Sequence, residues 1–128
     1  MADIEKVSIN LSVVDLGQID LLVDQGFYSS RTDFFRAAVR TQLGGHDEAI
    51  KQAVVRTSSV LGVILFDRER LERMQQHNEQ ARIVVVGLLI LSNDISVELA
   101  QATIKSIKVY GALRASPEVK AALADRIQ

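Results

Sequence analysis

The chain has 128 residues and a formal net charge of −1, which suits one ordinary domain or two very small ones. Its hydrophobic content of 48% excludes an intrinsically disordered protein, because disordered chains lack the apolar surface needed to offset the entropy lost on folding. The absence of cysteine excludes disulfides, thiolate zinc sites, iron–sulfur clusters and cysteine nucleophiles. Because the net charge is close to zero, any basic surface suited to nucleic acid must be local.

The N-terminal sequence and the longest apolar run argue against a membrane protein. Residues 1–6 lack the basic-then-apolar order of a signal peptide. The apolar run at residues 83–91 is too short to span a bilayer and is typical of a buried strand. We therefore expect a cytoplasmic protein that has no membrane partner.

Residues 6–12 alternate between polar and apolar side chains. The polar positions share one face and the apolar positions share the other: Lys6, Ser8 and Asn10 against Val7, Ile9 and Leu11. This two-residue period, with its β-branched side chains, predicts a half-buried strand.

Two helices are predicted after this strand. The first covers about residues 12–25, with Ser12 as its N-cap and Gly26 as its stop. The second begins at Ser30, where the spacing to Asp33 resembles a capping box. Its apolar positions are Phe35, Ala38, Val39 and Leu43, and they lead to a stop and hinge at Gly44 and Gly45.

The rest of the chain contains an internal repeat. Gly62, Gly87 and Gly111 recur 25 and then 24 residues apart, each within an apolar run. A polar turn and a helix follow each run, at about residues 69–78, 97–105 and 118–127. Apolar runs that alternate with helices predict a mostly parallel sheet covered on at least one face. Residues 46–55 suit either a further short helix or the first strand of this unit.

One short strand and two short helices cannot bury their apolar faces within a single chain. Two copies can do so by pairing their strands antiparallel and interleaving four helices, which also satisfies the strand edges. We expect the dimer core to contain Val7, Ile9, Leu11, Phe35 and Val39. The two paired strands would form a ribbon, and a ribbon of this size fits the major groove of B-DNA.

The outer face of such a ribbon would carry Lys6, Ser8 and Asn10 from each chain. A lysine donates to guanine acceptors, an asparagine can pair with adenine through two hydrogen bonds, and a serine is adaptable. The start of the second helix offers unpaired N–H groups and a positive dipole end, which attract phosphate. There the candidate phosphate contacts are Ser29, Ser30 and Arg31.

These residues resemble the ribbon–helix–helix superfamily of bacterial repressors. The resemblance covers roughly the first third of the chain, through residues 6–12, 19–23 and 26–40. In that family the three outward strand residues contact bases and the start of the second helix holds phosphate, which implies the same two groups of residues. Ser12 stands where many members have proline. Four acidic residues weaken the attraction for phosphate, namely Asp15, Asp20, Asp24 and Asp33.

The sequence predicts an α+β protein with two modules. Residues 1–44 would form an intertwined ribbon–helix–helix dimer for DNA binding, and residues 45–128 a β/α repeat domain for oligomerisation or for sensing an effector or protein partner. The expected function is sequence-specific binding of double-stranded DNA by a homodimer or higher homo-oligomer, as a transcriptional regulator and repressor.

No enzyme, cofactor or metal site is predicted. The chain lacks a recognisable pair of catalytic carboxylates or a nucleophile–base pair, and His46 and His77 are its only histidines. A ferredoxin-like sensing domain of the kind found in nickel-responsive members would need a histidine and cysteine cluster. Two alternatives remain: an antitoxin whose C-terminal part masks a toxin, and a scaffold in which the ribbon serves only self-assembly.

Overall fold

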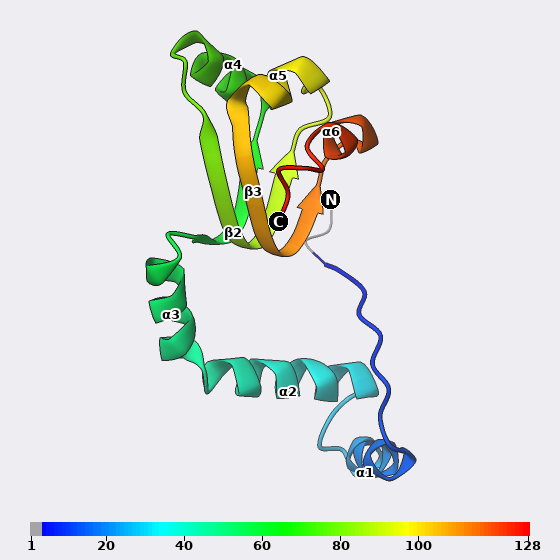
Figure 1. Ribbon diagram of the computed structural model, residues 1–128. Coiled ribbons are helices and arrows are strands. Elements are labelled where there is room, and N and C mark those ends of the chain that lie inside the picture. Colours follow the sequence, from blue (N-terminus) through cyan, green and yellow to red (C-terminus); the bar gives the residue numbers. More distant parts are fainter. Residues whose placement is uncertain (1–3) are drawn as a thin grey trace. The chain divides into compact units, whose positions relative to one another are not determined.

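The computed structural model describes residues 4–128 and divides them into two compact units, Ile4–Lys51 and Gln52–Gln128. The first unit contains α1 (Val13–Asp24), α2 (Arg31–Gly44) and the start of α3 (Asp47–Arg56). The second contains β1 (Val60–Phe66), α4 (Arg68–Gln76), β2 (Ala81–Leu91), α5 (Val97–Thr103), β3 (Ile104–Arg114) and α6 (Pro117–Ala122) (Figure 1). The predicted α+β class is confirmed.

Serine caps set the starts of α1 and α2. The Ser12 hydroxyl accepts a hydrogen bond from the Asp15 backbone N–H at 3.1 Å, and the Ser30 hydroxyl accepts one from the Asp33 N–H at 3.0 Å. In return, the Asp33 carboxylate accepts from the Ser29 N–H at 3.0 Å, one residue earlier than a standard capping box requires. Both predicted helices are therefore confirmed, with caps that satisfy otherwise unpaired N–H groups.

The predicted strand over residues 6–12 forms neither helix nor strand in the single chain. A strand exists only when another strand pairs with it, and the described part of the chain supplies no such neighbour for this segment. Its pairing with a second copy stays a prediction.

Residues 46–55, for which the sequence allowed either a helix or a strand, belong mainly to the helix α3. The helix α2 includes Gly44, and the chain re-enters helix at Asp47 after a single turn. Since the two compact units divide within α3, this helix connects them.

The second unit is built on a parallel sheet of three strands in the order β1-β2-β3. The predicted β/α repeat is confirmed, because Gly62 pairs with Gly87 and Gly87 with Gly111. Each of these glycines has a positive φ, of 133°, 137° and 128° in chain order. A Cβ on Gly87 or Gly111 would overlap the carbonyl oxygen of the glycine on the preceding strand. Close backbone approach thus requires glycine here, and β2 and β3 curve strongly (Figure 1).

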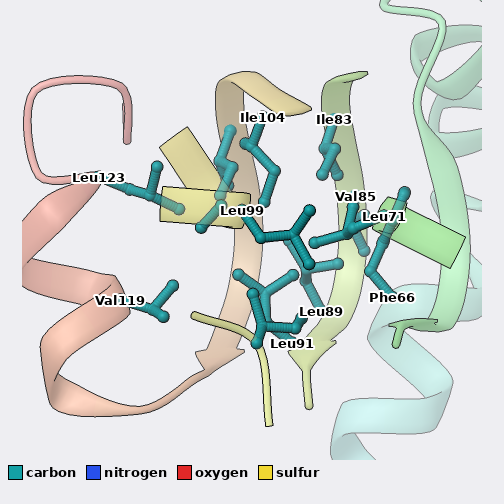
Figure 2. Close-up of a cluster of buried hydrophobic side chains, with 13 residues drawn as sticks. Phe66, Leu71, Ile83, Val85, Leu89, Leu91, Leu99, Ile104, Val119 and Leu123 are labelled. Atoms are coloured by element: carbon teal, nitrogen blue, oxygen red, sulfur yellow. The ribbon is translucent and has the colours of Figure 1, made fainter. Parts of the chain in front are cut away.

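A single hydrophobic core joins all six elements of this unit. Alternate positions of β2 point into it, among them Val85 and Leu89 (Figure 2). Leu71 of α4 and Leu99 of α5 cover them, and the two helices also pack on each other. Every described buried side-chain N or O atom in the chain has a hydrogen-bond partner. The core therefore contains no unsatisfied polar side chain among the described residues.

Two of the predicted helices are shorter than expected. The helix expected to reach residue 105 ends at Thr103, because Ile104 already belongs to β3 and is fully buried. The last helix ends at Ala122 instead of continuing to residue 127. Beyond it, Ile127 forms a parallel bridge with Ile107, whose N–H donates to the Arg126 carbonyl at 2.9 Å.

Candidate nucleic-acid interface

Both faces of the N-terminal segment are exposed in the single chain. The predicted base contacts Lys6, Ser8 and Asn10 are exposed, and so are the apolar side chains between them. Val7 is 83% exposed and Ile9 is 71% exposed. Complete burial of one such side chain contributes about 1.5–3 kcal/mol, so this apolar face favours a covered state.

The unit Ile4–Lys51 has almost no core of its own. Ile19 is the one buried hydrophobic residue among those described in this unit. The predicted dimer-core residue Leu11 is exposed, as are several other apolar side chains, namely Val13, Val14, Leu21, Phe27 and Leu43. A unit that folds stably with so little burial needs apolar surface from outside itself.

The remaining predicted dimer-core residues lie on one face of α2. Phe35 is half-buried and Val39 is exposed. Together with Arg36 and Arg40 they line a depression of about 240 Å³. The two apolar side chains, one helical turn apart, offer a place where an apolar side chain of another helix can pack.

Aromatic side chains connect the α1–α2 loop to α2. The rings of Tyr28 and Phe34 lie edge to face with centroids 5.0 Å apart, and Phe34 meets Phe35 in the same way at 5.9 Å. They hold the loop that carries Ser29 and Ser30 against its helix.

The start of α2 brings the predicted phosphate contacts Ser29, Ser30 and Arg31 together. The backbone N–H groups of Arg31 and Thr32 have no hydrogen-bond acceptor within residues 4–128. Because α2 has 14 residues, its dipole adds positive potential at this end. The arrangement can hold an anion through N–H groups and hydroxyls.

Arg31 also makes an ion pair that the sequence patterns did not indicate. Its Nε lies 2.7 Å from Asp20 Oδ1 and its Nη2 lies 2.8 Å from Asp20 Oδ2. The hydrogen bond from Arg31 lowers the pKa of Asp20, and the carboxylate raises the pKa of Arg31. Opposite charges eleven residues apart carry no spacing signal, because the contact depends on how α1 packs on α2.

The described residues contain neither a cluster suited to a metal ion nor a helix suited to crossing a membrane. Within residues 4–128, no group of three or more His, Asp or Glu side chains is placed to hold a metal ion. His46 is exposed, and the Nδ1 of His77 lies 2.8 Å from the Arg73 carbonyl oxygen. No helix in that same range combines the length and apolar character that crossing a bilayer requires.

The chain matches the model of a known protein family. A model described as the Ribbon-Helix-Helix transcriptional regulator family matches residues 2–120. The match extends over both units, so the prediction that the resemblance covers only the first third of the chain is not confirmed. Comparisons with curated proteins and with solved structures find no match.

Proposed function

Because the chain belongs to the ribbon–helix–helix transcriptional regulator family, we propose that it binds operator DNA as an intertwined dimer and represses transcription. The observation that supports this best is the exposure of Val7 and Ile9 in a segment whose polar side chains alternate with them. Pairing two such segments buries the apolar face and leaves the polar face free, as a DNA-reading ribbon requires.

In this proposal, six side chains read the major groove, three from each chain: Lys6, Ser8 and Asn10. All three are exposed in the single chain, and their donor and acceptor groups suit base edges. The dimer core would combine Val7, Ile9 and Leu11 of the ribbon with Phe35 and Val39 of α2. Palindromic half-sites would follow from the twofold axis of the dimer.

Phosphate binding at the start of α2 would fix the position of the dimer on DNA. The free N–H groups of Arg31 and Thr32 and the exposed hydroxyls of Ser29 and Ser30 support this role. The Ser30 oxygen accepts from Asp33, so its own hydrogen remains available to a phosphate oxygen. Arg31 would exchange its partner Asp20 for phosphate.

The second unit would serve oligomerisation or the sensing of an effector. Its complete hydrophobic core favours these roles over that of an antitoxin tail, since such tails usually order only on binding a toxin. A scaffold without DNA binding is the remaining candidate, and the low net charge favours it. We propose that the repressor is located in the cytoplasm and that it catalyses no reaction.

Selection of bound sequences from a random duplex pool tests the proposed function. Asn10→Ala should weaken binding to the selected operator by about 1–3 kcal/mol and relax preference at one base pair of each half-site. Asn93→Ala is the matched control, because this exposed asparagine lies in the second unit. A pool without enrichment, or equal discrimination by Asn10→Ala and the parent protein, would contradict the proposal.

A further inference from the structure

The strand β1 is the open edge of the parallel sheet. Its inner side pairs with β2 over all seven residues, Val60–Phe66. Its outer side, which faces away from β2, has no strand neighbour within the described residues. The opposite edge of the sheet is partly covered, because Ile127 bridges to Ile107 and the Gln128 N–H donates to the Ile107 carbonyl at 2.8 Å.

Within β1 itself none of the usual protections of an open edge is present; at the end of the strand, Arg70 Nη1 of α4 lies 3.4 Å from the Leu65 carbonyl oxygen. Open edges are normally blocked by charged side chains, proline, a bulge or a covering segment. The sequence of β1 contains no charge and no proline. One face of the strand also carries exposed apolar side chains, namely Leu61, Val63 and Leu65. Such an edge is typical of a strand that pairs with another chain.

The geometry at Gly62 supports the same conclusion. Inside the sheet, a Cβ on Gly87 or Gly111 would overlap the carbonyl oxygen of the preceding strand. Gly62 has nearly the same φ, of 133°, but a Cβ there would meet nothing within 4 Å. The outer side of β1 therefore has the backbone geometry that elsewhere in this sheet lies against a neighbouring strand.

We propose that β1 pairs antiparallel with β1 of a second copy of this chain. The two sheets would then continue into one, and the exposed apolar side chains of β1 would become cross-strand pairs. Pairing of like strands around a twofold axis closes the assembly at two copies, whereas head-to-tail pairing of β1 with β3 would add further copies, as a ring or a filament. The Ile127 bridge also obstructs part of the β3 edge.

The position of β1 in the chain favours a second copy as its partner. β1 begins four residues after α3 ends, so the proposed N-terminal dimer would hold two β1 strands on short tethers. A short tether raises the effective concentration of the second contact to about the millimolar range. The tethering argument rests on the proposed function, because it needs the N-terminal dimer. The open edge of β1 and the geometry at Gly62 do not depend on it.

Single cysteines test the pairing, because the native chain has none. The variants are Leu61→Cys, Val63→Cys and Leu65→Cys, with Tyr110→Cys as control. Tyr110 lies on β3 and is 47% exposed, against 51% for Val63. Directly opposed residues of an antiparallel pair have Cβ atoms about 4.5–5.5 Å apart, close to disulfide geometry. Mixing Leu61→Cys chains with Val63→Cys chains covers a twofold axis at Gly62, and mixing Val63→Cys chains with Leu65→Cys chains covers one at Ile64.

Under mild oxidation of the 128-residue chain at low micromolar concentration, one β1 position or one of the mixed pairs should give about tenfold more disulfide dimer than Tyr110→Cys. Circular dichroism checks that each variant is folded. Absence of a β1 cross-link would overturn the proposal. Equal cross-linking at Tyr110→Cys, which indicates face-to-face packing, would also overturn it, as would a product between Val63→Cys and Tyr110→Cys chains, which indicates β1–β3 pairing.

DNA binding by the same variants, measured separately under reducing conditions, distinguishes the two proposals. Binding without a β1 cross-link would overturn only the strand pairing. A β1 cross-link in a protein that selects no DNA sequence would overturn only the proposed function.

Discussion

Asp20 of α1 and Arg31 of α2 form an ion pair with two parallel hydrogen bonds of 2.7 and 2.8 Å. The pair connects α1 to the first residue of α2. Both side chains are about half exposed, so water and salt weaken the attraction between them. The same guanidinium is a proposed phosphate contact, which makes Asp20 an internal competitor of DNA.

Asp20→Asn should release Arg31 for phosphate. We expect tighter binding to random duplex and a steeper fall of log K with log salt, by about one for each additional phosphate that the dimer neutralises. Fluorescence anisotropy at several salt concentrations measures the slope. Asp24→Asn removes the same charge from the same helix but has no arginine partner among the described residues, and it should leave the slope unchanged. Equal slopes for the two variants would exclude the competition.

The Asp20–Arg31 pair should also be visible in a titration. The hydrogen bond from Arg31 lowers the folded-state pKa of Asp20 below its ordinary value of 3.8. The contribution of the pair to stability is therefore present above that value and is lost as the pH falls through the lowered pKa. The carboxyl carbon resonance of Asp20 should titrate below 3.8, and Arg31→Gln should move the midpoint upward. A midpoint unaffected by Arg31→Gln would show that the pair does not persist in solution.

Ile9→Glu should weaken the proposed dimer, because the new carboxylate would lie inside the ribbon interface without a partner. A buried unpaired charge costs about 3–5 kcal/mol, which corresponds to a dissociation constant at least ~100-fold higher. Analytical ultracentrifugation over a dilution series gives this constant. Ser8→Glu, one residue away on the proposed outer face, should leave assembly intact and weaken only DNA binding. An undisturbed dimer in Ile9→Glu would show that Ile9 lies outside the interface.

Gly87→Ala should destabilise the second unit. The methyl group would overlap the Gly62 carbonyl, and φ at this position is 137°; strained backbone of this kind costs about 1–3 kcal/mol. Urea denaturation followed by circular dichroism measures the change. Gly17→Ala is the control, since a Cβ there meets nothing within 4 Å and alanine should stabilise a helix by about 1 kcal/mol. If Gly87→Ala and the parent protein unfold at the same urea midpoint, close backbone approach is not the reason for glycine at this position.

The sequence by itself determined the local elements of this protein. Ser12 and Ser30 mark the helix starts that the structure has, because a cap needs only a side chain and a backbone N–H three residues apart. The spacing of Gly62 and Gly87 predicted repeated strands in a mostly parallel sheet, because each repeat supplies one strand and one helix to the same layers. The structure pairs these two glycines directly.

Contacts between distant residues were decided only by the tertiary structure. The Asp20–Arg31 pair, the Ile127–Ile107 bridge that ends α6 early and the choice of helix for residues 46–55 carried no unambiguous local pattern. Periodicity and caps involve neighbours within a few residues, whereas these features depend on how finished elements pack in space. Packing brings side chains together regardless of their separation along the chain, so no short-range pattern records it.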